Sequence, residues 1–180
     1  MDTSPRTYRF LPADVYMSGY RVVGKIMVST NGIMGIMNDI NKSGVEIHDA
    51  RLARIHMPTK LVDHFEVVRL IKSQIFAICA ARREDLGPTG IQRGGYSNIV
   101  SMPARIATNV YELEGKLEVA GRFDFAAITA DKTRNFIPLY EGNLSAILIP
   151  NLKVESPGIL FNREKVDFLA LLGQRVKEDK

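Results

Sequence analysis

The alternation of apolar and polar residues predicts strands in two widely separated parts of the chain. Residues 111–119 alternate apolar positions with Glu and Lys, which is typical of a strand with one face on water. Residues 20–28 are rich in β-branched and aromatic residues and predict a similar strand. Both segments carry the pattern Tyr-x-x-x-Gly-Lys, and Tyr20 and Tyr111 lie 91 residues apart (111 − 20). This offset predicts an internal repeat.

The segments that follow these two strands also correspond. Apolar residues between positions 33 and 40 recur at helical spacing after Asn31, a suitable N-cap, and predict a short amphipathic helix that ends near Gly44. The matching residues 122–134 are compatible with a helix or with a hairpin turn, and the repeat favours a helix over 123–130.

Extended runs of apolar residues follow both predicted helices. Residues 45–55 and 136–149 each predict either two strands or one bulged strand. Turn-forming residues near Pro58 and Pro150 end these runs. The segments after the turns predict strands at 65–71 and 159–162, and then a last strand or helix at 74–81 and 165–172.

Together these elements predict an α+β, β-rich fold made of two tandem similar units. Each unit is expected to run strand, short helix and several strands, as a small β-barrel or β-roll, and the two units are expected to pack as a pseudo-dimer. Glycine, proline and charged residues between the units predict a linker. The expected boundaries are an N-terminal lead-in at 1–19, unit 1 at 20–83, the linker at 84–103, unit 2 at 104–173 and a charged tail at 174–180.

The composition changes this picture little. The chain has 180 residues, with 24 Lys and Arg against 20 Asp and Glu, and the two signs of charge are interleaved. Such a small basic excess does not by itself predict a nucleic-acid partner. No apolar stretch approaches the roughly 18 residues of a membrane span, and the sequence has one cysteine and no signal-peptide pattern. We therefore expect a cytoplasmic protein without membrane contact.

Few residues in the sequence predict chemistry. Cys79 lies in the apolar segment 75–81, where a structural role is more typical than a nucleophilic one. A hairpin centred on Lys60 would place His56 opposite His64, and the two imidazoles could share a metal ion or be ordinary surface histidines. Neither a serine-hydrolase motif nor a phosphate-binding loop occurs in the sequence. We expect no catalytic residue, no metal and no other cofactor, and hence a protein that is not an enzyme.

One short segment resembles a ligand-binding motif. The residues Asp39-Ile-Asn41-Lys-Ser-Gly44 are similar to the Asp-x-Ser-x-x-Gly motif of the PilZ receptors for cyclic dinucleotides, with Asn41 in place of Ser. That family is a small β-barrel and also uses two upstream arginines spaced by four, a spacing that no upstream arginines have here. The end of a helix at Gly44 explains the same residues.

A second resemblance covers more of the chain. Residues 159–166, with the sequence Ile-Leu-Phe-Asn-Arg-Glu-Lys-Val, together with Gly115 and residues 136–139, are similar to small β-domains of Sm-like character in uncharacterised bacterial proteins. In Sm proteins a comparable Arg-Gly turn and an Asp or Asn loop bind RNA. Here Asn162-Arg163 lacks the Gly, and the predicted helix is foreign to that fold. The resemblance therefore implies the architecture and not RNA binding.

The repeat and the lack of a catalytic motif predict a non-enzymatic binding or scaffold module that acts through protein–protein contacts or self-association. Exposed edge strands offer one mode of contact. Methionine side chains adapt to partners of varied shape, and three of them lie on or near the first predicted helix. We expect the contact surface to include Met27, Met34 and Met37.

The alternative is a domain that binds a nucleotide, a cyclic dinucleotide or a nucleic acid. Its affinity would depend on cationic side chains and would fall steeply with salt. The residues expected to bind the phosphates are Arg69, Lys72, Arg82, Arg83 and Arg93.

Overall fold

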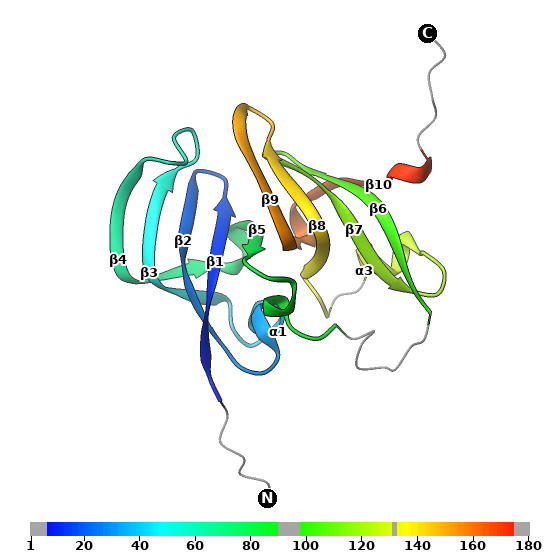
Figure 1. Ribbon diagram of the computed structural model, residues 1–180, viewed down its shortest axis with the longest axis horizontal. Helices are drawn as coiled ribbons and strands as arrows, with labels where there is room; N and C mark the ends of the chain where they lie inside the picture. The colour runs from blue at the N-terminus through cyan, green and yellow to red at the C-terminus, as the bar shows by residue number, and fades with distance from the viewer. Residues whose placement is uncertain (1–6, 90–97, 131–132, 175–180) are drawn as a thin grey trace, which may run out of the picture.

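Ten strands and two short α-helices form the computed structural model, which describes residues 7–89, 98–130 and 133–174 (Figure 1). Short 3-10 helices, labelled η, follow several of the strands. The first half of the chain forms β1 Arg9–Met17, β2 Tyr20–Val28, α1 Gly32–Met37, β3 Gly44–Arg54, β4 Leu61–Ile71, η1 Lys72–Gln74, β5 Ile75–Ala80 and η2 Arg83–Leu86. The second half forms β6 Ile99–Thr108, β7 Tyr111–Ala120, α3 Phe125–Ala130, β8 Phe136–Ala146, β9 Ile149–Asn162, η3 Arg163–Lys165, β10 Val166–Leu171 and η4 Leu172–Gln174.

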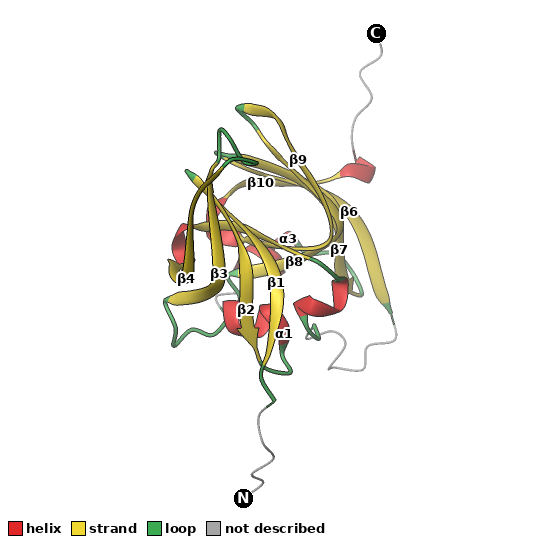
Figure 2. Cartoon of the chain, turned by 60° about the vertical axis from the view of Figure 1, so that its left-hand side comes forward, coloured by secondary structure: helices red, strands yellow, loops and turns green. Residues whose placement is uncertain are grey.

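All ten strands belong to one antiparallel sheet, which is curved and open (Figure 2). The strand order is β10-β6-β7-β8-β9-β5-β1-β2-β3-β4, so each half occupies one side of the sheet. The prediction of a β-rich chain is confirmed, but the sheet does not close into the expected barrel. The reason is that β5 pairs with β9 of the other half and not with β4, which leaves β4 and β10 as the two edges.

Equivalent strand pairs in the two halves have the same register. The pairing of β1 with β2 aligns Ala13 with Gly24, and the pairing of β6 with β7 aligns Ala104 with Gly115. Both positions differ by 91 residues (104 − 13 and 115 − 24). The offset seen in the sequence therefore recurs in the pairing of the strands.

Each half also has a bulge at the same place in its sheet. Asp49 in β3 and Glu141 in β8 have positive φ angles of 51° and 47°, and the register with the neighbouring strand shifts beside each of them. A Cβ atom on Gly24 would lie 2.5 Å from its nearest neighbour, and one on Gly115 would lie 2.8 Å away. Backbone and side chains approach so closely at both bulges that only glycine fits without a shift.

The buried side chains form two clusters, and each cluster contains residues from both halves of the chain. The first cluster lies mainly in the first half and also contains Phe136, Tyr140 and Leu160. The second lies mainly in the second half and also contains Tyr16, Ile55, Phe76, Ala77 and Cys79. Because the halves bury apolar side chains in each other, separating them would expose both cores to water.

Most of the element predictions are confirmed, with differences at the ends. The ambiguous residues 122–134 contain the helix α3 and not a hairpin, and 45–55 form one bulged strand, β3. The helix α1 ends at Met37, earlier than expected, because a loop turns the chain before Gly44 begins β3.

Two segments that the sequence placed outside the units are strands. Residues 9–17 of the expected lead-in form β1, and residues 99–103 of the expected linker begin β6. Residues 90–97 of that linker and 175–180 of the expected charged tail lie outside the described residues.

Candidate functional site

The junction between β5 and β9 joins the two halves of the sheet. Its backbone pairing aligns Ala77 with Phe161 and Cys79 with Ile159. All six residues of β5 are buried, because side chains on one face enter the first core and those on the other face enter the second. The strand therefore contributes to both cores at once.

Tyr111 at the start of β7 reaches across this junction. Its fully buried side chain donates a hydrogen bond of 2.6 Å to the backbone carbonyl of Met17. Its ring packs edge-on against Tyr16 and Phe76, with centroid distances of 5.8 and 5.6 Å. Burial raises the pKa of the Tyr111 phenol above its usual range, so that the group stays a neutral donor.

Arg83 in η2 makes a second polar bridge between the halves. Its Nη2 lies 2.5 Å from Oε1 of Glu118 in β7. The guanidinium carbon also lies 3.9 Å from the centroid of the Tyr140 ring, in cation–π geometry. Arg83 was predicted to bind a phosphate, and in the structure its donors face groups of the same chain.

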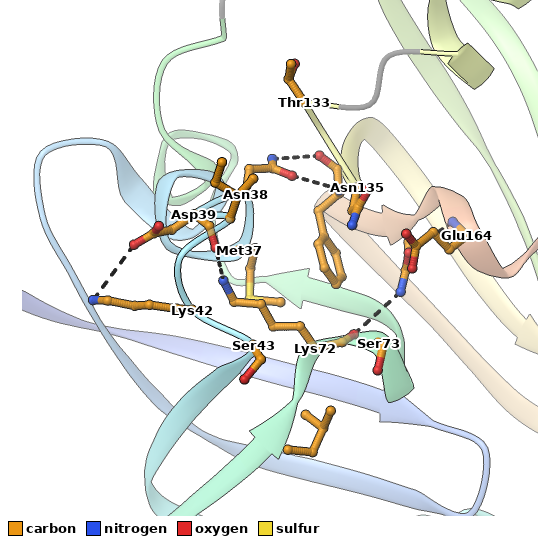
Figure 3. Close-up of a pocket in the computed structure, with 14 residues that line it drawn as sticks. Met37, Asn38, Asp39, Lys42, Ser43, Lys72, Ser73, Thr133, Asn135 and Glu164 are labelled. Carbon is orange, nitrogen blue, oxygen red and sulfur yellow. Dashed lines mark hydrogen bonds and ion pairs between the residues drawn. The ribbon is translucent and has the colours of Figure 1, made fainter.

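A pocket of about 260 Å³, lined mostly by polar residues, lies beside the junction (Figure 3). Its walls come from the loop after α1, from η1, from the residues before β8 and from η3. In the loop after α1, the Asn38 amide donates to the carbonyl oxygen of Phe136 and accepts from its backbone N–H, both at 2.9 Å. This side chain therefore satisfies both backbone groups at the start of β8.

Lys72, another predicted phosphate-binding residue, lines this pocket but is only 8% exposed. Its Nζ donates to the backbone carbonyls of Ile36 at 2.6 Å and Asp39 at 2.9 Å. Burial lowers the pKa of the Lys72 ammonium. The Ile36 carbonyl lies in the last turn of α1 and that of Asp39 just after the helix, where a cation is favourable.

Asn162 is buried in the wall of the same pocket. Its Nδ2 donates to the carbonyl oxygen of Ile75 at 2.9 Å, and its Oδ1 accepts from the backbone N–H of Glu164 at 3.0 Å. The amide thus fixes η3 against the start of β5. Three polar side chains of the pocket, on Asn38, Lys72 and Asn162, hold the two halves and their loops in place.

The remaining predicted phosphate-binding residues also contact acidic groups of the chain. Arg69 in β4 lies 3.8 Å from Glu46, and Arg82 lies 2.8 Å from the buried Asp85. Arg93 lies outside the described residues. The four described cations of this set therefore each have a carboxylate or backbone carbonyl partner within the chain.

The three methionines expected on a contact surface do not share one. Met34 and Met37 are buried in the first core, because α1 packs that side of the helix against the sheet. Met27, in β2, is exposed. The helical spacing of Met34 and Met37 therefore indicated core packing and not an open groove.

The expected pairing of the histidines is wrong. His64 in β4 lies opposite Arg51, because the hairpin between β3 and β4 is centred near Met57, earlier than expected. His56 lies in the turn after β3. The His64 ring instead bonds to Asp49, with Nε2 and Oδ1 2.6 Å apart, and this hydrogen bond lowers the pKa of the Asp49 carboxyl.

The part of the chain that the structure describes contains no group of three or more His, Cys, Asp or Glu side chains able to hold a metal ion. Cys79 is buried in β5, and burial raises the pKa of its thiol far above the usual value. A thiol in that state is a poor nucleophile, which fits the structural role expected for it.

The two sheet edges expose apolar side chains, most of all on β4. In this strand only Leu70 is buried. The exposed large apolar side chains of β4 belong to Leu61, Val62, Phe65, Val67 and Ile71. At the other edge β10 exposes Phe168. The sequence predicted exposed edge strands but not which strands would form the edges.

Comparison with protein-family models, with curated proteins and with solved structures finds no significant match. Within the described residues, no helix is long and apolar enough to cross a bilayer. Function therefore has to be inferred from the geometry of the chain itself.

Proposed function

We propose that the chain is a non-enzymatic binding or scaffold module that acts through protein–protein contacts at the edges of its sheet. The observation that carries this proposal is β4, an 11-residue edge strand in which only Leu70 is buried. Unpaired backbone groups beside exposed apolar side chains form a ready site for pairing with another strand. Burial of those side chains would add to the stability of the contact.

The proposal includes two equivalent units, residues 9–86 and 99–174, joined as a pseudo-dimer by β5 and β9. These units are wider than the sequence predicted, since each now includes its first strand. The shared register and the shared bulge support the equivalence. The resemblance to Sm-like domains, like the cytoplasmic location, stays a prediction.

Nucleotide binding has less support than edge contacts. Lys72 and Arg83 would have to bind phosphates, yet both use their donors to hold elements of the chain together. Releasing either side chain to a ligand would leave part-buried carbonyls or a carboxylate without its partner, which costs free energy. The edge strands present no comparable cost.

A photoreactive amino acid introduced at Val67 or Phe168, in cells that make the full chain, tests the proposed function. Both side chains are exposed on the edge strands. Lys25 is the matched control, because its side chain is also exposed but lies on the inner strand β2, which is paired on both sides. We expect cross-linked protein adducts from the two edge positions at clearly higher yield than from Lys25. Equal yields at all three positions would contradict the proposal.

A further inference from the structure

We infer that copies of this chain associate head to tail, with β10 of one copy pairing with β4 of the next. This inference rests on the proposed function and identifies the partner as a second copy of the chain. The junction inside the chain already shows such a contact, made by β5 and β9. Each of those two strands has an equivalent at an end of the sheet, and within the described residues that equivalent pairs on one side only.

The strand β10 is the equivalent of β5. In the first half β5 pairs with β1 and aligns Ile78 with Val15, and in the second half β10 pairs with β6 and aligns Leu169 with Ile106. Both residues of the second pair lie 91 positions after those of the first (169 − 78 and 106 − 15). The outer edge of β5 meets β9, whereas the outer edge of β10 has no strand beside it among the described residues.

The strand β4 is likewise the equivalent of β9. The pairing of β3 with β4 aligns Ile47 with Val68, and that of β8 with β9 aligns Leu139 with Ile159. The outer edge of β9 meets β5, while β4 lies at the outer side of the first half, and no strand in the described part of the chain pairs with its outer edge (Figure 1). The free edges of β10 and β4 are thus equivalent to the edges of β5 and β9 that pair at the internal junction.

Side chains that cross the internal junction have exposed apolar equivalents at the free edge of the second unit. Ile55 and Ala77 enter the second core and are 8% and 0% exposed. Ile147 and Phe168 occupy the same places in the second unit and are 47% and 49% exposed. The equivalence of the isoleucines is supported by their backbone N–H groups, which donate to the carbonyls of Gly19 at 3.0 Å and of Val110 at 2.9 Å.

The surface of the first unit that would receive the second copy also has an exposed residue whose equivalent at the internal junction is buried. Tyr111, which lies under β5 at the internal junction, is fully buried and bonded to the Met17 carbonyl. Its equivalent, Tyr20, lies 91 positions earlier and is 44% exposed. A second copy seated on β4 would cover the Tyr20 ring and offer its hydroxyl the carbonyl of Thr108, the counterpart of Met17.

The internal junction also fixes the register of the contact between copies. Adding 91 to the residue numbers of β5 gives the equivalent residues of β10, and subtracting 91 from those of β9 gives the equivalent residues of β4. Applied to the pairs of the internal junction, this gives the expected partners. The pairs are Phe168 with Leu70, Leu169 with Arg69, Ala170 with Val68, and Leu171 with Val67.

At two equivalent positions, the contact between copies has a more polar residue than the internal contact. Leu160 is buried at the internal junction, and its equivalent in β4 is Arg69, which is exposed. Phe76 is buried there too, and its equivalent in β10 is Asp167. We therefore expect association that is reversible and depends on concentration. Because an edge pairs with a different edge, the contact continues to a third copy, until a ring closes or a filament grows.

Cysteine cross-linking between two full-length variants tests this geometry. One variant carries Val68→Cys and the other Ala170→Cys, both in a Cys79→Ala background so that no other thiol is present. Directly opposed residues of antiparallel strands have Cα atoms about 4.5–5.5 Å apart, within the range that a disulfide spans. With oxidised glutathione as oxidant, the mixture should give a covalent dimer as its main product, and each variant alone should stay monomeric under denaturing conditions.

The matched control replaces Val68→Cys by Val62→Cys, which lies on the same strand but about 20 Å away at about 3.3 Å per residue. Equal cross-linking with this control, or cross-linking of the Val68→Cys variant with itself, would overturn the inference. So would wild-type protein that sediments as a monomer at every concentration up to about 1 mM, a range that covers weak association. If photo-cross-linking at the edge positions gives adducts with other proteins only, self-association is rejected and the proposed function is kept. If the cross-linking yields at the edge positions equal that at Lys25, both self-association and the proposed function are rejected.

Discussion

Asn38 and Phe136 lie 98 residues apart in the chain and are joined by two hydrogen bonds of 2.9 Å, one in each direction. The Asn38 side chain thus acts toward β8 as a strand backbone would, satisfying an N–H and a carbonyl together. The contact is made from the loop after α1 and lies beside the pairing of β5 with β9, without being part of it. It shows that the two units are held by loops as well as by strands.

Replacing Asn38 should weaken the whole structure, because Phe136 is buried and its two backbone groups would lose their partner. We expect Asn38→Ala to lower the free energy of unfolding by about 1–3 kcal/mol, as measured by urea denaturation. Asn41→Ala is the control, since that side chain is exposed in the same loop, and its effect should stay within about 0.5 kcal/mol. Equal effects of the two substitutions would show that the Asn38 contact contributes little.

The two bulge glycines should be equally intolerant of a side chain. We expect Gly24→Ala and Gly115→Ala each to lower the free energy of unfolding by about 1–3 kcal/mol, since the added Cβ has no space. Gly19→Ala serves as control, because a Cβ there would have no neighbour within 4 Å. Thermal or urea unfolding measures all three, and a mild effect at only one of the two bulges would argue against their equivalence.

Two tyrosines in equivalent places should respond differently to loss of the hydroxyl. Tyr111→Phe removes the bond to the Met17 carbonyl and should destabilise the chain by about 0.5–1.5 kcal/mol. Tyr20→Phe should leave the stability of dilute protein unchanged, because Tyr20 is exposed there. It should instead weaken self-association in sedimentation experiments. A Tyr20 variant that associates as well as the wild type would remove this residue from the interface.

Alkaline pH should destabilise the fold through its buried phenols. Burial raises the pKa of Tyr140 from the model-compound value of 10.0 to about 12, so the folded chain keeps a proton that the unfolded chain loses. The stabilisation is complete below pH 10 and is lost as the pH rises from there through about 12. Urea denaturation at increasing pH should show this fall. Tyr140→Phe should make it shallower, and an unchanged slope would contradict the assignment.

The repeat was visible in the sequence because the bulge in each unit requires a glycine at the equivalent position. Gly24 and Gly115 face backbone at close approach, and the lysine after each pairs with the bulge residue, as Lys116 does with Glu141. These constraints preserve the Gly-Lys pattern while other positions vary. The first strand of each unit was assigned wholly or partly to the lead-in or the linker, and each contains a proline, Pro12 or Pro103, a residue that is uncommon inside strands. At Pro12 the strand β1 has no partner on its β5 side, since that pairing begins only at Ala13, so proline is tolerated at this local edge.

The polar part of the candidate site could not be predicted. Nothing in the sequence connects Asn38 with a backbone group 98 residues away. In the sequence, Lys72 resembles a free phosphate-binding cation, and only the folded chain brings it to the end of α1. The predicted pairing of His56 with His64 is wrong, because a shift of the turn by a few residues changes which side chains lie opposite each other. Long-range partners and turn centres both depend on the folded chain.

Amide hydrogen exchange at low and high protein concentration tests most directly whether the edges of the sheet are the binding surface. We expect backbone amides of residues 67–70 in β4 and 168–171 in β10 to become protected together as concentration rises. Amides of the inner strand β2, which already has partners on both sides, should not change. Protection that rises elsewhere while both edges keep exchanging freely would contradict the account.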